Sequence, residues 1–190
     1  MSNQLELRLT GSGGQGLILG GVILAEAAIM EGKKVIQSQS YGPEARGGSS
    51  KAEVIISDEE IDFPKVLRTN LLLTLTQKSC SKYIGSLDRD GILLIDSSVM
   101  VPSTNKAKRV IQVPILKTAN EVIGKSMVAN IIAVGAINSI LHIASEKSLE
   151  FAVLSRVPKG TEDLNKRALE AGYKLVKNYN SLKENCQLVG

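Results

Sequence analysis

The residues most able to do chemistry lie in two glycine-rich segments. The first is Gly11-Ser-Gly-Gly-Gln-Gly16, which follows the alternating stretch Leu5–Leu9 and precedes the apolar run Leu17–Met30. Glycines in such a turn let the backbone approach a phosphate, and the next helix presents free N–H groups to it. The candidate anion-binding residues are therefore Gly11, Ser12, Gly13, Gly14, Gln15 and Gly16.

A nicotinamide cofactor would need a second feature, which is an acidic side chain about twenty residues further on that holds the ribose. Here the corresponding strand end reads Gln37-Ser-Gln39, with no carboxylate and no arginine directly after it. A stand-alone nicotinamide-dependent dehydrogenase is therefore the alternative interpretation rather than the favoured one. Two others stay open: the glycines serve only close packing of strand against helix, or they bind a different anion.

The second segment is Gln39-Ser-Tyr-Gly-Pro-Glu-Ala-Arg-Gly-Gly48, within a polar stretch from Ser38 to Ser50 that we expect to be a long loop. Arg46 could contact a partner chain, contact a phosphate together with nearby hydroxyls, or remain a surface charge neutralised by Glu44. We expect both segments to share one sheet edge, because loops leaving neighbouring strands converge there. The predicted partner interface comprises Tyr41, Gly42, Pro43, Glu44, Arg46, Gly47 and Gly48.

Groups able to catalyse on their own are scarce. The one histidine, His142, falls at the end of an apolar helix pattern, where capping or packing is its expected role. Cys80 is expected to be buried, and its distance in sequence from Cys186 suggests neither a disulfide framework nor a cysteine-ligated cluster. We predict no catalytic residue and no metal site on this chain.

Short aliphatic strands alternate with helical patterns, which predicts an α/β fold. We expect three layers, α/β/α, with a Rossmann-like, mostly parallel or mixed sheet and a helical C-terminal part. Residues 1–180 are expected to form one domain and residues 181–190 a polar, loosely held tail. The predicted strands are Leu5–Leu9, Val35–Gln37, Ala52–Ser57, Asn70–Thr76, Gly91–Asp96 and Val110–Val113, and the predicted helices are Leu17–Met30, Ser79–Leu87, Met127–Ile143, Ser148–Leu154 and Thr161–Asn178.

Composition restricts the partners. A net charge of +4 with two Phe, four Tyr and no Trp does not suit nucleic-acid binding. The apolar windows are too short to span a bilayer and no signal peptide is apparent, so we expect a cytoplasmic protein without membrane contact. The helix Leu17–Met30 carries a single charge, Glu26, and must be covered on both sides. Another subunit is a candidate for the second cover.

Taken together, these motifs resemble the gamma subunit of 2-oxoacid:ferredoxin oxidoreductases, and the loop with Tyr41 and Pro43 is closest to the 2-oxoglutarate type. The resemblance implies alpha, beta and delta (ferredoxin-like) partner subunits that hold thiamine diphosphate and iron–sulfur clusters, with CoA as substrate and ferredoxin as electron acceptor. For this chain it implies an assembly role, with a contribution to CoA binding at Gly11–Gly16 and Arg46. Further segments carrying the resemblance are Leu24–Ala28, Lys51–Asp58, Gly91–Asp96, Asn130, Asn165–Ala168 and Gly172.

Overall fold

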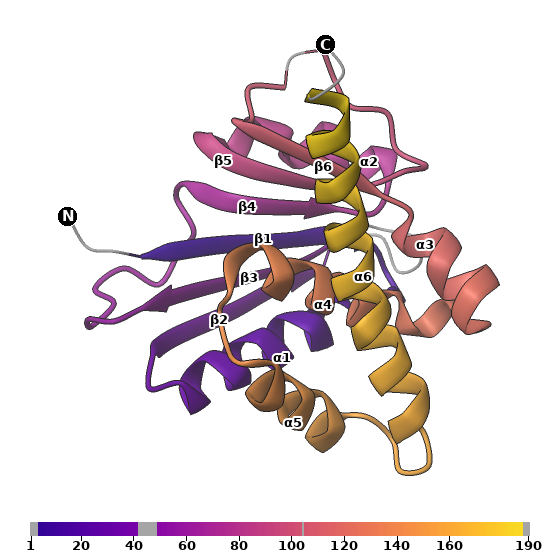
Figure 1. Ribbon diagram of the computed structural model, residues 1–190. Helices are drawn as coiled ribbons and strands as arrows, with labels where there is room; N and C mark the ends of the chain where they lie inside the picture. Colours follow the sequence, from indigo (N-terminus) through magenta and orange to yellow (C-terminus); the bar gives the residue numbers. More distant parts are fainter. Residues whose placement is uncertain (1–3, 42–48, 104, 188–190) are drawn as a thin grey trace.

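The centre of the fold is a mixed β-sheet. The computed structural model describes residues 4–41, 49–103 and 105–187, and within these six strands form one sheet in the order β2-β3-β1-β4-β5-β6 (Figure 1). Strands β1, β4, β5 and β6 are parallel, whereas β3 lies antiparallel between β1 and β2. The strands are β1 (Leu5–Ser12), β2 (Lys34–Tyr41), β3 (Ser49–Ser57), β4 (Thr69–Thr74), β5 (Leu87–Asp96) and β6 (Arg109–Val113).

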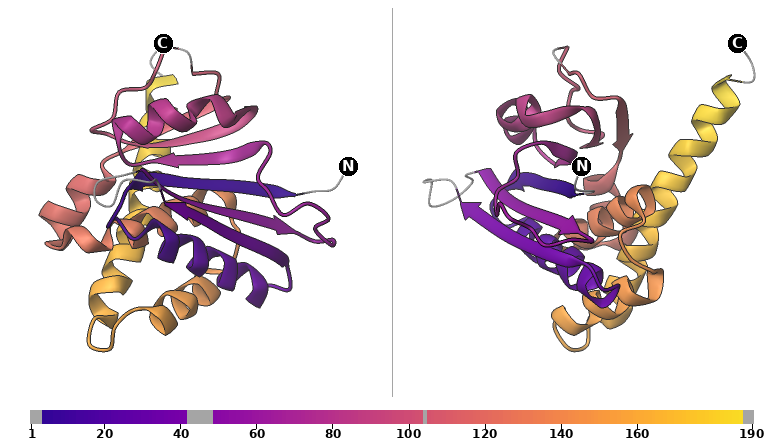
Figure 2. Two further views of the ribbon diagram at one scale, coloured as in Figure 1. Left: turned by 180° about the vertical axis from the view of Figure 1, so that it is seen from behind. Right: turned by 90° about the vertical axis from the view of Figure 1, so that its left-hand side faces the viewer.

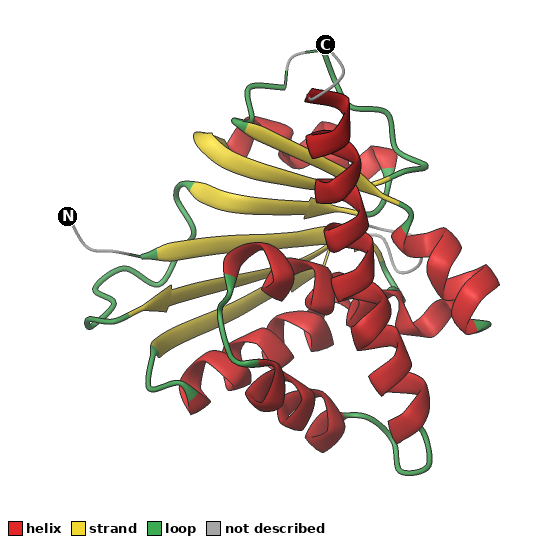
Figure 3. Cartoon of the chain, in the orientation of Figure 1, coloured by secondary structure: helices red, strands yellow, loops and turns green. Residues whose placement is uncertain are grey.

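Helices cover both faces of this sheet unequally (Figures 2 and 3). One face carries α2 (Gln77–Tyr83), and the other carries α1 (Leu17–Met30), α4 (Ala129–Leu141) and α6 (Glu162–Gln187), while α5 (Glu146–Arg156) packs on α1. The predicted three-layer α/β fold with a helical C-terminal part is confirmed. A short helix, α3 (Ile115–Lys117), and a π-helical turn (Thr118–Ile123) follow β6, and the sequence patterns predicted neither.

Strand β4 shows why the central strands are continuously apolar. Successive side chains in a strand point to opposite faces. Leu71 and Leu73 join the large core beneath α1 and α4, whereas Leu72 joins Cys80 of α2 on the other face, and all four are fully buried. Because helices cover both faces of the sheet at β4, none of Leu71, Leu72 and Leu73 faces solvent, and the strand is apolar at each of these positions.

The apolar first helix is covered by its own chain. Helix α1 contacts β2 and β3 on one side and α4 and α5 on the other, and Glu26 forms an ion pair with Arg156 of α5 at 2.8 Å. The second cover of this helix, for which another subunit was a candidate, is provided by α4 and α5 of the same chain. Ile29 and Met30, at the end of α1, remain exposed.

The polar stretch that was expected to be a loop from Ser38 to Ser50 is largely strand. Strand β2 continues to Tyr41 and β3 begins at Ser49, because the two strands pair as an antiparallel hairpin, with Ser38 opposite Glu53. Backbone pairing determines these elements, and pairing does not require apolar side chains. Pairing with the other side of β3 likewise extends β1 through Gly11 and Ser12, so these two residues belong to the strand rather than to the turn.

Helix α6 runs beyond its predicted end at Asn178 as far as Gln187. Two contacts fix it to β6 past the end of its apolar stripe. The Tyr179 hydroxyl donates to the Val110 carbonyl at 2.6 Å, and Arg109 donates to the Asn180 side chain at 2.6 Å. Residues 181–187, part of the segment that was expected to be a loosely held tail, continue this helix.

Candidate functional site

The two glycine-rich segments leave the sheet at the same edge. Gly11 pairs with Ser50 from one side and Tyr41 pairs with Ser50 from the other, so the ends of β1 and β2 flank the start of β3. The prediction of a shared edge is confirmed for the described residues. Tyr41 contributes its backbone to β2, and residues 42–48, with Pro43, Glu44 and Arg46, lie outside the described part of the chain.

The first turn is closed by one of its own side chains. The Gln15 side-chain oxygen accepts a hydrogen bond from the Ser12 N–H at 2.7 Å, and the same oxygen lies 2.2 Å from where a Cβ on Gly11 would stand. Gly14 and Gly16 have φ angles of 87° and 70°, which disfavour any other residue. Packing and backbone conformation therefore account for the glycines at 11, 14 and 16, and the Ser12 N–H is already satisfied.

The turn leads directly into the N-terminal end of α1. Gly13 and Gly14 are exposed, and α1 begins at Leu17 with no side-chain cap on its first N–H groups. Such a helix end carries a partial positive charge, which favours an anion.

A buried amide attaches α4 to the turn. Asn130, with 4% of its surface exposed, donates from Nδ2 to the Gly16 carbonyl at 3.1 Å. A Cβ on Gly16 would stand 2.6 Å from the same nitrogen. Asn130 was noted from the sequence for the family resemblance and not as a site residue, although a polar residue inside the apolar run from Met127 to Leu141 was a signal that could have identified it.

The sheet order argues against the dinucleotide alternative. In nucleotide-binding α/β proteins the ribose-binding acid ends a strand that is parallel and adjacent to the first. Here antiparallel β3 separates β1 from β2, and the end of β2 carries Gln37, Ser38 and Gln39 in place of a carboxylate.

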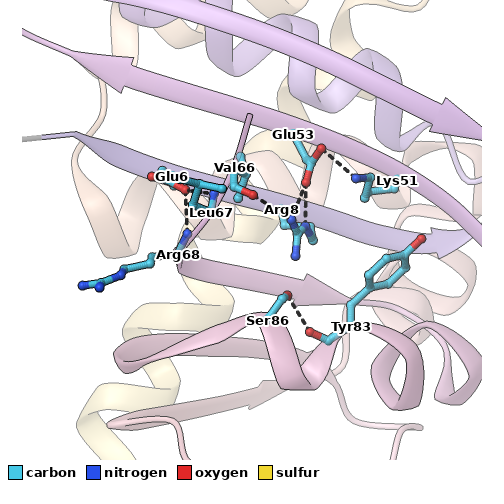
Figure 4. A network of polar contacts seen from close by, with 9 residues as sticks. All are labelled: Glu6, Arg8, Lys51, Glu53, Val66, Leu67, Arg68, Tyr83 and Ser86. Carbon is cyan, nitrogen blue, oxygen red and sulfur yellow. Dashed lines mark hydrogen bonds and ion pairs between the residues drawn. The ribbon is translucent and has the colours of Figure 1, made fainter. Parts of the chain in front are cut away.

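A buried ionic network lies on the face of the sheet that α2 covers, close to this edge (Figure 4). Arg8 donates from Nε (2.8 Å) and Nη2 (2.5 Å) to Oε1 of Glu53, which is directly opposite it in β3, and Lys51 donates to Oε2 at 2.7 Å. Arg8 also donates to the Val66 carbonyl at 3.3 Å, and its guanidinium lies 5.9 Å from the centre of the Tyr83 ring. Neither Arg8 nor Glu53 was predicted from the sequence to be a site residue.

Electrostatics keep Glu53 ionised. Burial by itself would raise the pKa of this carboxyl, but hydrogen bonds from Lys51 and Arg8 and the positive charges of both residues hold the pKa below its ordinary value. Glu53 and Arg8 are each 8% exposed. The network therefore links β1 to the first half of β3, within the hairpin.

The two other candidate reactive side chains, His142 and Cys80, have structural roles. His142 is the C-cap of α4 in a left-handed conformation, with φ 50°, and its N–H donates to the Asn138 carbonyl at 2.8 Å, in agreement with the predicted capping role. Cys80 is fully buried, as expected, and burial raises the pKa of its thiol.

The described residues contain neither a candidate membrane span nor a candidate metal site. None of the helices there is long and apolar enough to cross a membrane. Nor does that part of the chain bring three or more His, Cys, Asp or Glu side chains together where they could hold a metal ion.

Comparisons with known proteins identify the family. The chain is 46% identical over 177 residues to 2-oxoglutarate synthase subunit KorC of Methanocaldococcus jannaschii, covering 90% of this chain and 94% of that protein. It is 40% identical over 178 residues to the same subunit of Methanothermobacter thermautotrophicus, with coverages of 90% and 94%. The crystal structure of a keto/oxoacid ferredoxin oxidoreductase gamma subunit from Geobacter sulfurreducens superimposes with a TM-score of 0.84 at 44% identity, covering 94% of this chain and 99% of that one.

The family model for pyruvate ferredoxin/flavodoxin oxidoreductase matches residues 6–175, from the first strand of the sheet well into α6. The match includes the Gly11–Gly16 turn, the hairpin and the ionic network between β1 and β3. The chain therefore belongs to the pyruvate ferredoxin/flavodoxin oxidoreductase family.

Proposed function

We propose that this chain is the gamma subunit of a 2-oxoglutarate:ferredoxin oxidoreductase. The complex would convert 2-oxoglutarate, CoA and oxidised ferredoxin to succinyl-CoA, CO2 and reduced ferredoxin. The observation that carries the proposal is the likeness to 2-oxoglutarate synthase subunits over nearly the whole of both chains. The Tyr41–Gly48 segment, which resembles the 2-oxoglutarate type, supports the choice of substrate.

In the proposed complex, other subunits would carry out decarboxylation and electron transfer. Alpha, beta and delta subunits would hold thiamine diphosphate and the iron–sulfur clusters, and ferredoxin would take the electrons. This chain would contribute the surface at the shared edge of β1, β2 and β3, where the Tyr41–Gly48 segment would contact a partner subunit. The ionic network of Arg8, Lys51 and Glu53 supports this role, because it makes the base of the hairpin rigid.

The second part of the proposal is that this chain itself contacts CoA. CoA carries phosphates, and the uncapped start of α1 beside the exposed Gly13 and Gly14 offers positive potential and backbone N–H groups to an anion. Arg46, four residues before Ser50, would add a charged donor.

Purification and assay of the complex test the proposed function. With an affinity tag on this chain and its partner subunits co-expressed, we expect co-purification and CoA-dependent ferredoxin reduction that is fastest with 2-oxoglutarate. Pyruvate and branched-chain 2-oxoacids serve as the comparison substrates. A chain that emerges alone and binds NAD would contradict the proposal and support the dehydrogenase alternative.

Replacement of Arg46 separates the roles proposed for the shared edge. If Arg46 contacts a CoA phosphate, Arg46→Ala should raise the apparent KM for CoA about tenfold, because loss of a charge-assisted hydrogen bond costs about 1.5 kcal/mol. If Arg46 contacts a partner subunit, the same variant should retain less of that subunit during purification.

Arg89→Ala is the matched control, since Arg89 is exposed near the start of β5, at the opposite edge of the sheet. It should change neither the KM for CoA nor subunit retention. If Arg46→Ala behaves like the control in both measurements, Arg46 has no role at this surface.

A further inference from the structure

A small cavity lies beside the start of α1, where the first residues of α4 and α6 approach it. The cavity has a volume of about 100 Å³, which is room for several water-sized groups. Its walls are mostly apolar, with Leu19 of α1, Ile131 of α4 and Leu164 of α6 among them. Two asparagines, Asn130 of α4 and Asn165 of α6, also line it. The cavity therefore combines apolar walls with two side-chain amides.

The acceptor half of the Asn165 amide is unused. Asn165 is 5% exposed, and its Nδ2 donates to the Thr161 carbonyl at 2.8 Å and to the Thr161 hydroxyl at 3.0 Å. These bonds use both Nδ2 hydrogens and fix the orientation of the amide, because the reverse orientation would place Oδ1 against a carbonyl oxygen. Within the described residues Oδ1 accepts no hydrogen bond. Polar atoms on such deeply buried side chains usually have a partner, so this one calls for a donor.

The Asn130 amide offers a complementary donor. Asn130 is 4% exposed, its Oδ1 accepts from the Ile131 N–H at 2.9 Å, and its Nδ2 donates one hydrogen to the Gly16 carbonyl at 3.1 Å. The second Nδ2 hydrogen has no acceptor among the described residues. A free acceptor on α6 and a free donor on α4, on the walls of one apolar cavity, match the N–H and the C=O of a secondary amide flanked by aliphatic carbons.

We infer that this cavity binds an aliphatic secondary amide, which in the assembled complex belongs to the pantetheine arm of CoA. CoA as the source of the amide rests on the proposed function. The cavity is continuous with the proposed phosphate contact, because Asn130 lines the cavity and also holds the carbonyl of Gly16, the last residue of the turn. In CoA the aliphatic amide arm is attached to a phosphate, so the phosphate can lie at the turn while the arm enters the cavity. The volume suits one amide with its neighbouring carbons rather than the whole arm.

Titration of the full-length chain with the two halves of CoA tests this assignment. Pantetheine carries the amides without a phosphate, and adenosine 3′,5′-bisphosphate carries phosphates without the arm. In ¹⁵N-labelled chain, pantetheine should shift the side-chain amide NMR signals of Asn130 and Asn165. The bisphosphate should leave the Asn165 signals unchanged, because it has no group that can enter the cavity.

Two variants block the cavity in different ways. Asn165→Leu removes the free acceptor, and Val157→Phe fills the space from an apolar wall without changing either amide. Each should weaken pantetheine binding about fivefold or more. The matched control is Asn138→Leu, because Asn138 is 3% exposed in α4 but exchanges both halves of its amide with the backbone of Ala144, at 2.9 and 3.0 Å. The control should leave pantetheine binding unchanged, and circular dichroism shows whether each variant is folded.

The same variants in the co-purified complex connect the cavity to the reaction. Asn165→Leu and Val157→Phe should raise the apparent KM for CoA about fivefold and leave the KM for 2-oxoglutarate unchanged. If the chain binds pantetheine but the complex shows no CoA-dependent ferredoxin reduction, the proposed function fails and the amide site stands. Binding of the bisphosphate alone would leave the anion contact at the turn and overturn the amide site. Pantetheine shifts that neither blocking variant weakens would also overturn it, and the unused acceptor would then bind water only.

Discussion

Gly172→Ala is expected to destabilise the fold by about 3 kcal/mol, at the upper end of the cost of inserting atoms into a packed interior. Helices α4 and α6 cross so closely that a Cβ on Gly172 would stand 2.1 Å from the Ile132 carbonyl oxygen and 2.8 Å from the Ala136 nitrogen. Alanine favours a helix over glycine by about 1 kcal/mol, but this gain is smaller than the clash. Both neighbours are backbone atoms, so the strain can be relieved only by moving the helices apart.

The crossing is reciprocal, which makes the clash difficult to avoid. A Cβ on Gly135 of α4 would stand 2.4 Å from the Leu169 carbonyl oxygen of α6. Urea denaturation followed by circular dichroism measures the effect of Gly172→Ala, and Gly85→Ala is the control, because a Cβ at Gly85 would meet no atom within 4 Å. The control should change the free energy of unfolding by less than about 0.5 kcal/mol. Equal stabilities of the two variants would show that the helices separate at little cost.

Helix α6 shows where sequence patterns stop being informative. The stripe of Leu164, Ala168 and Leu175 predicted an amphipathic helix correctly, since the period of apolar residues reflects which face is buried. The stripe does not state what the buried face packs against, nor at what distance. The need for glycine at 172 arises from the backbone of Ile132 and Ala136 on another helix, and no local pattern contains that information.

The polar parts of the β2–β3 hairpin, beyond the predicted strands Val35–Gln37 and Ala52–Ser57, were missed for a related reason. Periodicity detects strands through alternating burial, and Ser38, Gln39 and Ser40 lie on an edge strand where little is buried. Their pairing with β3 is a relation between two segments. The central strand β4, covered on both faces, was by contrast evident as a continuous aliphatic run, with boundaries that differ by only a residue or two.

At the candidate site, the sequence predicted the shared edge but not the contacts that shape it. Glycine-rich turns after strands are local signals, so Gly11–Gly16 could be placed next to the hairpin from topology alone. The contacts of Gln15 with Ser12 and of Asn130 with Gly16 depend on side-chain positions that follow only from the folded chain. The ionic pair of Arg8 and Glu53 likewise depends on the register of β1 against β3.

Removal of the Glu53 carboxylate should cost about 3 kcal/mol of stability. In Glu53→Ala, the Arg8 guanidinium and the Lys51 ammonium would lose the anion that both contact, and breaking a buried pair from one side leaves uncompensated charge. Chemical denaturation at neutral pH measures the loss. The control is Glu150→Ala, which breaks the exposed Glu150–Lys166 pair and should cost less than about 1 kcal/mol. Similar losses in the two variants would mean that solvent reaches the Arg8–Glu53 pair.

Acid titration of stability gives a second signature of the same residue. Because the pKa of Glu53 is lower in the folded chain than in the unfolded one, its contribution is complete above the unfolded value of 4.5 and is lost as the pH falls through the folded value. Glu53→Gln keeps the shape of the side chain and removes this titration. The stability difference between the unmodified chain and this variant should therefore be constant from pH 7 to about pH 5 and shrink at lower pH. A difference that grows on acidification would mean that burial outweighs the two cations, and Glu53 would then be a strained acid rather than the anchor of the hairpin.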